Sequence, residues 1–279
     1  MKRTATLFGG TLFLCLMSSS AAIAEVEWAP AIRDAISFHA SFDKSMDADI
    51  AKGDGKLYFA ESLERKDIQV GLPPAGVKWS STGGRAGGAL QFMTKTNELV
   101  FFKGQGNVPE TKPGFQGTVS LWLKLTPKKD LPKGFVDPLQ ITDSKWNDGS
   151  FFVDFDQAEA RTFRLGVFSE YKFWNPADTS FDDIAVDKRP MVHVPDGKFE
   201  NSKWTHVAFC WSKFNEDVEA EAKLYIDGKL QGKIPGKQRF DWKADDVVIM
   251  LGINYVGGLD ELTIFDRPLS AEEIATLCR

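Results

Sequence analysis

Asp260 and Glu261 open an apolar strand near the chain end, and a carboxylate in that position invites a chemical explanation. Side chains of an extended strand alternate between two faces, so Asp260 shares a face with Leu262 and Ile264. We therefore expect Asp260 to point toward the core. A buried carboxylate is costly unless it accepts hydrogen bonds, pairs with a cation or binds a metal ion. Backbone amides of the Gly257–Gly258 turn are one candidate partner.

The same alternation singles out recognition-type side chains on the opposite faces of five apolar strands. These strands are expected around 118–125, 150–155, 162–168, 205–212 and 222–226. Their outward positions include Trp122, Asp154, Arg164, His206 and Tyr225. Aromatic faces with planar hydrogen-bonding groups suit a sugar or peptide site, so these five residues are the predicted binding site. The alternative is a second small core covered by loops, because 22 Phe and 8 Trp must mostly be buried.

Loops next to these strands supply further candidates. If residues 157–161 join two strands, Asp154 lies opposite Arg164. Residues 170–203 are predicted to form a long surface excursion, a kind of loop that often carries function. Trp146 and Trp174, each followed by Asn, are predicted rim contacts, unless they pack to hold the excursion in place.

The sequence lacks the motifs of familiar catalytic and nucleotide sites. It contains no H-E-x-x-H, no G-x-S-x-G and no P-loop. The glycines of residues 83–88 precede a strand, whereas phosphate-binding loops precede a helix, so we interpret them as turn residues. Basic residues are scattered, which excludes a nucleic-acid footprint.

Residues 1–24 predict a signal peptide, with basic Lys2 and Arg3, an apolar run and small residues before a cleavage site at Ala24. The apolar run is too short to span a bilayer. The remaining residues 25–279 keep 32 basic and 39 acidic residues, a net charge of −7. We expect one exported domain, periplasmic or secreted, without a membrane span or a nucleic-acid partner.

Cys210 and Cys278 are the cysteines beyond the predicted signal. In an exported protein such a pair can form a disulfide. The alternative is two separate small buried residues. Both interpretations stay open at this point, because geometry decides between them.

The expected elements are almost all strands. Short alternating runs rich in Val, Phe, Trp and Leu, separated by Gly, Pro, Asn and Asp, predict an all-β sandwich or barrel. Asp227–Gly228 between two such runs predicts a type I′ hairpin turn. Ser270 and Glu273 predict the capping box of a short C-terminal helix.

Six stretches, in order, resemble the laminin-G-like jelly-roll domains of the concanavalin A-like lectin and glucanase superfamily. They are FHASFD from 38, GGRAGGALQF from 83, GTVSLWLK from 117, WTHVA from 204, LYIDGK from 224, and GLDELTIF from 258 running into LSAEEI. The chain is most similar to exported bacterial versions of the domain. The resemblance implies one LamG-like domain over residues 25–279, an antiparallel two-sheet jelly-roll sandwich with a concave face and rim loops. Its members bind carbohydrates or proteins, and some relatives cleave polysaccharides.

The resemblance also implies a second partner for Asp260. Several superfamily members hold a structural calcium ion between the first strand and a late Asp-Glu strand, which would make Asp260 and Asp43 ligands. No other cofactor is expected. Glucan hydrolases of the superfamily carry Glu-x-Asp-x-Glu or Glu-x-Asp-x-x-Glu on one strand. No Glu-x-Asp occurs in this chain, which favours a non-catalytic role.

The resulting hypothesis is a non-catalytic, extracytoplasmic recognition module for a polysaccharide or glycoprotein. One alternative is a polysaccharide lyase or hydrolase, in which His206, Tyr225, Asp154 and Arg164 supply a general base and charge neutralisation. A second alternative is an envelope or structural component that binds another envelope protein through its aromatic rim.

Overall fold

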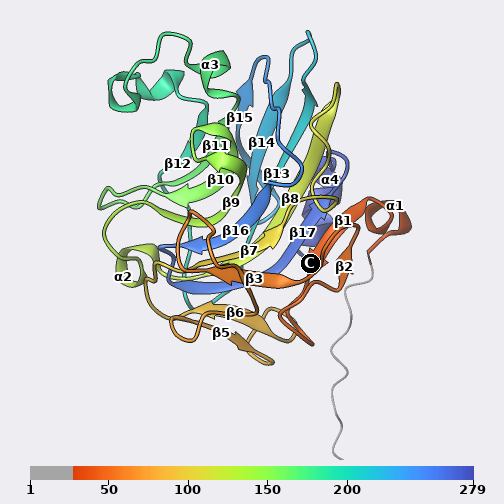
Figure 1. The fold of residues 1–279 in the computed structure, drawn as a ribbon, viewed down its shortest axis with the longest axis vertical. Coiled ribbons are helices and arrows are strands. Elements are labelled where there is room, and N and C mark those ends of the chain that lie inside the picture. Colours follow the sequence, from red (N-terminus) through yellow and green to blue (C-terminus); the bar gives the residue numbers. More distant parts are fainter. Residues whose placement is uncertain (1–27) are drawn as a thin grey trace, which may run out of the picture.

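The computed structural model describes residues 28–279, which form two antiparallel β-sheets packed face to face (Figure 1). This confirms the predicted all-β jelly-roll sandwich. The predicted signal peptide lies outside the described residues. Among the helices in the described range, none is long and apolar enough to cross a membrane.

Sheet A, the nine-stranded sheet, consists of β1 (Ile36–Ala40), β2 (Ile50–Ala51), β5 (Val77–Ser80), β6 (Ala89–Phe92), β8 (Phe115–Lys124), β13 (Thr205–Phe214), β14 (Glu221–Ile226), β15 (Lys229–Pro235) and β17 (Gly257–Phe265). Sheet B, the eight-stranded sheet, consists of β3 (Leu57–Ala60), β4 (Gln69–Val70), β7 (Leu99–Lys103), β9 (Val136–Lys145), β10 (Asp148–Phe155), β11 (Phe163–Phe168), β12 (Met191–Val194) and β16 (Val248–Ile253). The short helices are α1 (Pro30–Arg33), α2 (Pro127–Asp130), α3 (Tyr171–Trp174), α4 (Ala271–Leu277) and the 3₁₀ turns η1 (Phe181–Asp183) and η2 (Val186–Lys188).

The strand order shows which strands can share a surface. Sheet A runs β15-β14-β13-β8-β17-β1-β2, with β6 on β17 and β5 on β6. Sheet B runs β12-β11-β10-β9-β16-β7-β3-β4. The predicted alternation holds on both sheets: Leu121 and Leu123 of sheet A, and Phe151 and Val153 of sheet B, belong to one core cluster. The intervening residues of each strand therefore face away from the other sheet.

Two predicted local structures are confirmed. Asp227 and Gly228 both have positive φ, 47° and 73°, as the type I′ turn between β14 and β15 requires. Ser270 Oγ accepts a hydrogen bond from the Glu273 amide at 3.2 Å, and the Ser270 amide donates to Glu273 Oε2 at 2.8 Å. This capping box starts α4.

Helix α4 covers part of the outer face of sheet A. Its buried residues Ile274 and Leu277 form a second apolar cluster with Ala208, Tyr225 and Phe265 of the sheet. In Figure 1, α4 lies beside β8 and β17, on the side away from β9 and β10. The outer face of sheet A is therefore partly a small core.

Residues 170–203 do not form only a loop. They contain α3, η1 and η2, and then β12, which pairs with β11 at the edge of sheet B. Figure 1 shows α3 and the turns after it projecting beyond this edge of the sandwich. The excursion therefore returns to the sheet and adds an edge to its outer face.

The strand at Asp260 differs from the expected alternation. Asp260 is buried as predicted, with no exposed surface, but Leu259 and Leu262 are both core residues. Pairing with β8 shifts register between Asp260 and Thr263, and Glu261 has a φ of 52°. A β-bulge thus breaks the alternation, so the prediction that Asp260 shares a face with Leu262 is wrong.

Candidate functional site

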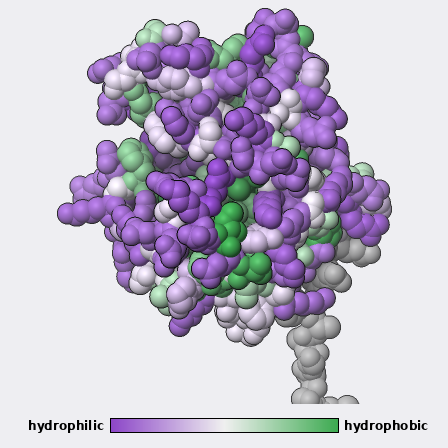
Figure 2. Space-filling view, viewed as in Figure 1, coloured by the Kyte–Doolittle hydropathy of each residue, from purple (hydrophilic) through white to green (hydrophobic). Residues whose placement is uncertain are grey.

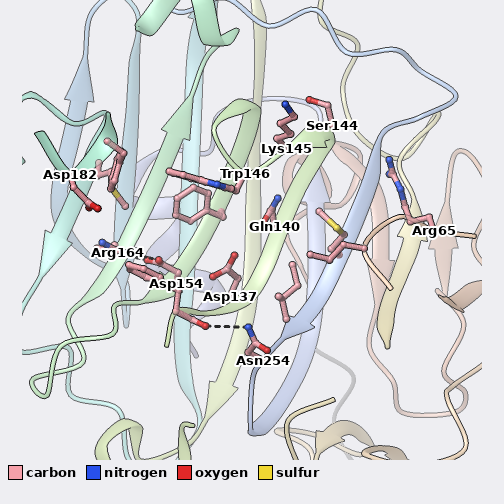
Figure 3. A pocket seen from close by; sticks show the side chains of 17 residues that line it. Arg65, Asp137, Gln140, Ser144, Lys145, Trp146, Asp154, Arg164, Asp182 and Asn254 are labelled. Atoms are coloured by element: carbon pink, nitrogen blue, oxygen red, sulfur yellow. Dashed lines mark hydrogen bonds and ion pairs between the residues drawn. The ribbon is translucent and has the colours of Figure 1, made fainter. Parts of the chain in front are cut away.

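A pocket of about 550 Å³ lies on the outer face of sheet B. It lies over β9, β10, β11, β12 and β16, and the loops at residues 63–65 and 181–182 complete its walls (Figure 3). Eight of its 17 lining residues are apolar: Leu63, Phe135, Trp146, Phe152, Phe181, Met191, Met250 and Ile253. Its volume is in the range of small-molecule sites.

One floor row of the pocket is mainly apolar. Strand pairing aligns Met250, Gln140, Phe152, Gly166 and Met191 across five neighbouring strands. A Cβ on Gly166 would lie 2.2 Å from Phe152 Cζ, so only glycine lets the Phe152 ring lie across β11. We call this set the apolar row, although Gln140 places one amide in its middle.

The neighbouring row is ionisable; Asp137, Asp154 and Arg164 line the pocket, and His193 continues the row on β12 beyond the lining residues. Asp154 lies opposite Arg164, which lies opposite His193, and Asp137 of β9 adjoins Asp154. We call these four residues the ionic row. It lies two residues along the strands from the apolar row, a separation of about 6.6 Å.

The Asp154–Arg164 pair anchors the ionic row. Arg164 Nε donates to Asp154 Oδ1 at 2.8 Å, and Arg164 Nη2 bonds the other carboxylate oxygen. Both side chains are buried, at 2% and 6% exposure. Burial raises the pKa of Asp154 to about 6 although the Arg164 hydrogen bond opposes the shift. The Asp154 carboxylate is therefore mainly ionised at neutral pH, but its pKa of about 6 lies close to that pH.

Asp137 is the second carboxyl of the row. Burial raises its pKa well above the ordinary value, the charge on Asp154 adds to this, and Arg164 opposes it. The raised pKa favours the protonated form of Asp137, which can donate a hydrogen bond. In Figure 3, Asp137 and Asp154 lie close together on the floor, with Gln140 beside them.

Aromatic side chains form the upper wall. Trp146, in the β9–β10 turn, is 42% exposed, and its ring meets those of Phe168 at 5.4 Å and Phe181 at 5.2 Å, both edge-on. The guanidinium of Arg189 lies 4.2 Å from the Phe181 ring centre. These contacts hold Trp146 in place while leaving part of its ring free for a ligand. Figure 2 shows that hydrophilic side chains dominate the surface on the side it displays, where a hollow separates the excursion from the body.

The structure divides the five predicted concave-face residues between two sheets. Asp154 and Arg164 line the pocket on sheet B. Trp122, His206 and Tyr225 lie on β8, β13 and β14 of sheet A, all buried. The prediction that these five gather on one surface is wrong, because alternation shows which face a residue takes but not which sheet carries it.

The three sheet A residues belong to the covered face. His206 Nε2 lies 2.8 Å from Ser120 Oγ, and burial lowers the pKa of His206 to about 3, which keeps its ring neutral. Arg85 lies over the Trp122 ring, 4.3 Å from its centre. These contacts agree with the small-core alternative for this face and remove His206 and Tyr225 from the pocket.

Cys210 and Cys278 do not form the disulfide that the sequence left open; both are free thiols. Cys278 Sγ lies 3.0 Å from His206 Nδ1, and Cys210 is buried on β13. Burial raises the pKa of both thiols to about 11. The structure therefore agrees with two separate small residues.

The two rim tryptophans have different surroundings. Trp146 lines the pocket, whereas Trp174 does not. Trp174 Nε1 donates to the Asn147 carbonyl at 2.9 Å, and its ring meets Phe168 edge-on at 4.9 Å. Trp174 thus packs the excursion against the β9–β10 turn, as the packing alternative expected.

Asp43 and Asp260 both hold the glycine-rich loop of residues 83–88. Asp260 Oδ2 accepts from the Arg85 amide at 2.6 Å, and Asp43 Oδ1 accepts from the Gly88 amide at 2.9 Å. A Cβ on Gly84 would lie 2.8 Å from Asp260 Oδ2, so the loop approaches closely only because it lacks a side chain there. The amide partners of Asp260 are those of Arg85 and Glu261, and not those of the Gly257–Gly258 turn.

These contacts bear on the expected calcium site. The carboxylate oxygens that face the loop already accept backbone amides. Across residues 28–279, no group of three or more His, Cys, Asp or Glu side chains is arranged to hold a metal. The residues therefore do not fit a preformed Ca²⁺ cage of 6 to 8 oxygens, and calcium at Asp43 and Asp260 stays an untested prediction.

Sequence reasoning missed two floor residues, Gln140 and Asp137, and their neighbour His193. Gln140 lies between core residues Leu139 and Ile141, so alternation could have identified it as outward-facing. Asp137 precedes a proline near the start of β9, and His193 lies on an edge strand that was expected to be loop. Their grouping depends on strand order, which the sequence alone did not provide.

Comparison with known proteins agrees with this architecture. The family model described as the concanavalin A-like lectin/glucanases superfamily, of laminin-G type, matches residues 104–275, more than half of the chain. No curated protein matches the chain at a significant level.

Similar solved structures share the fold at low identity. Domain 4 of AbnA, an extracellular GH43 arabinanase from Geobacillus stearothermophilus solved with arabinotriose, has 18% identity and a TM-score of 0.53, covering 88% of this chain and 98% of that one. The receptor binding domain of botulinum neurotoxin D has 13% identity and a TM-score of 0.55, and the match covers 88% of this chain and 53% of that chain. The binding domain of botulinum neurotoxin serotype G has 13% identity and a TM-score of 0.53, and the match covers 87% of this chain and 50% of that chain. This chain thus spans about half of those toxin chains.

Proposed function

The chain belongs to the concanavalin A-like lectin/glucanase superfamily, and on this premise we propose that it is an exported, non-catalytic recognition protein whose sheet B pocket binds a carbohydrate or the glycan of a glycoprotein. The observation that carries the proposal is the pocket itself, where the exposed ring of Trp146 stands above the buried Asp154–Arg164 pair. A sugar offers apolar C–H faces that stack on aromatic rings and hydroxyls that bond planar polar groups.

The charge state of the floor supports a neutral, hydroxyl-rich ligand. Asp154 and Arg164 neutralise each other, and burial favours the protonated, uncharged form of Asp137. The floor therefore offers both donors and acceptors without a strong net charge. The arabinotriose complex of the similar AbnA domain is consistent with carbohydrate as the ligand class.

A polysaccharide lyase or hydrolase is the second candidate. The observation that favours it is the pair of carboxyls with raised pKa in one pocket, because such shifts gather at functional sites. Asp137 and Asp154 would then share acid and base roles. His206 and Tyr225 have no part in this version, because both are buried on sheet A.

A glycan-array screen of residues 25–279, with and without calcium, tests the proposal. Binding to a defined glycan, without cleavage products on prolonged incubation, is the expected result. Products from the bound glycan would instead support the second candidate. Absence of binding to any glycan would contradict the proposal and direct attention to protein partners. Calcium-dependent binding that Asp260→Asn abolishes would support the calcium prediction.

A further inference from the structure

The pocket presents more apolar surface than a single sugar ring would contact. Met250, Phe152 and Met191 face the hollow from three strands, and Leu63 and Phe135 add to its walls. A free monosaccharide carries hydroxyls around its ring. Hydroxyls placed against these side chains would lose water without gaining hydrogen bonds, which costs free energy. The apolar row is therefore better matched to hydrocarbon.

Gln140 is the second observation that points to a ligand. Its side chain is only 5% exposed and lies within the apolar row, between Met250 and Phe152. No hydrogen bond joins the Gln140 side chain to another residue between 28 and 279, and Figure 3 shows it at the centre of the pocket floor. The Gln140 amide atoms are not among the fully enclosed, unpartnered polar atoms of residues 28–279, so they open onto the pocket and are available to a bound molecule.

The two floor rows lie about 6.6 Å apart, and each suits a chemically different part of a ligand. The ionic row offers the Asp154–Arg164 pair and the Asp137 carboxyl. The apolar row offers two flexible methionines, which adapt to alkyl and aryl shapes, around one amide. A ligand that satisfies both rows has a hydroxyl-bearing part joined directly to a hydrocarbon part.

We propose that the pocket recognises an amphipathic glycoside, with the sugar on the ionic row and its alkyl or aryl aglycone on the apolar row. Gln140 hydrogen-bonds at the junction, to the glycosidic oxygen or an adjacent hydroxyl. The inference rests on the proposed carbohydrate function and names the ligand class within it.

Calorimetric titration with matched methyl and octyl β-glycosides of D-glucose, D-galactose and L-arabinose, each below its micelle-forming concentration, tests this inference. For at least one sugar, the octyl glycoside should bind at least tenfold more tightly than the methyl glycoside. Burying about two methylene groups is enough for that factor. Equal affinities for methyl and octyl forms would overturn the inference while leaving the carbohydrate function standing.

Octan-1-ol distinguishes the two proposals. If it binds as tightly as the octyl glycosides, the sugar contributes nothing, and both the glycoside inference and the carbohydrate function are contradicted. Weaker binding of octanol, by about tenfold or more, supports the joint use of both rows.

Two variants test which pocket residues produce the preference for octyl glycosides. Met191→Gln, on the edge strand, should remove most of the octyl preference, because it replaces hydrocarbon surface of the apolar row with an amide. Gln140→Leu should weaken octyl glycoside binding about tenfold. Leu230→Gln, exposed on β15 of sheet A, is the matched control and should have no effect. An octyl preference unchanged in Met191→Gln, in a folded variant, would contradict the assignment.

Discussion

At the scale of single residues, the Asp154–Arg164 pair combines a structural role with a proposed binding role. Each side chain is more than nine-tenths buried, so each compensates the charge of the other in the interior. Buried pairs of this kind add little net stability, but removing one partner leaves an uncompensated charge. The pair therefore holds the pocket floor in one arrangement.

Asp154→Asn should lower the free energy of unfolding by about 3–5 kcal/mol at pH 7.5, because the Arg164 guanidinium remains buried without its counterion. Urea denaturation followed by fluorescence measures the change. Asp182→Asn, at the pocket rim, is the control and should unfold as the wild type does. The Asp154→Leu/Arg164→Met double variant should regain part of the loss. Wild-type stability of Asp154→Asn would show that the pair is not buried as described.

Asp260 makes stability depend on pH. Burial raises its pKa from 3.8 to about 8, although the Arg85 and Glu261 amides oppose the shift. The folded state thus favours the protonated form, and the stability contributed by this group is fully present below the unfolded pKa of 3.8. It is lost as pH rises toward 8.

The difference in unfolding free energy between the wild type and Asp260→Asn should therefore shrink from about pH 4 to about pH 8. Denaturation series at several pH values, with exposed Asp266→Asn as control, measure this dependence. Asp266→Asn should follow the wild-type curve. Parallel curves for the wild type and Asp260→Asn would mean that Asp260 is ionised at low pH, as direct binding of a cation would produce.

At the scale of elements, α4 decides which face of the sandwich is free. Ile274 is fully buried and belongs to the cluster that covers Ala208 and Tyr225. The outer face of sheet B has no such helix in the described structure, and the pocket lies there. One short capped helix therefore distinguishes the covered face of sheet A from the face of sheet B that carries the pocket.

Ile274→Ala should cost about 2–5 kcal/mol of stability, because it leaves a cavity between α4 and sheet A. Chemical denaturation measures the loss, and exposed Glu272→Ala should leave the midpoint close to that of the wild type. Glycan affinity should be unchanged in folded Ile274→Ala, since the pocket lies on the other sheet. Selective loss of glycan affinity would instead assign binding to the α4 face.

At the scale of the whole molecule, alternation and turn chemistry predicted the sandwich, the β14–β15 turn, α4 and the Asp154–Arg164 contact. These features depend on neighbours in the chain or on a single hairpin. The grouping of Asp137, Gln140 and Met250 depends on β16 lying beside β9, more than 100 residues apart in sequence. The same dependence on strand order explains why Trp122, His206 and Tyr225 were assigned to the wrong surface.

The bulge at Glu261 illustrates another limit of the pattern. A strict period of two predicted that Asp260 and Leu262 share a face. The positive φ of Glu261 breaks this period, and the Asp260 carboxylate instead lies against residues 83–88, where it accepts the Arg85 amide. Bulges leave little trace in residue type, because Glu is not a residue that favours the left-handed region. The glycines that receive Asp260 were nevertheless visible in the sequence.

The most direct test of the central claim, that the sheet B pocket binds carbohydrate, is the affinity of Trp146→Ala for the best glycan from the array, measured by calorimetry. Trp146 is 42% exposed in the pocket, whereas Phe173, 37% exposed, does not line it and provides a matched aromatic control. We predict at least tenfold weaker binding for Trp146→Ala, unchanged binding for Phe173→Ala, and native circular dichroism for both. Wild-type affinity of a folded Trp146→Ala variant would contradict the account.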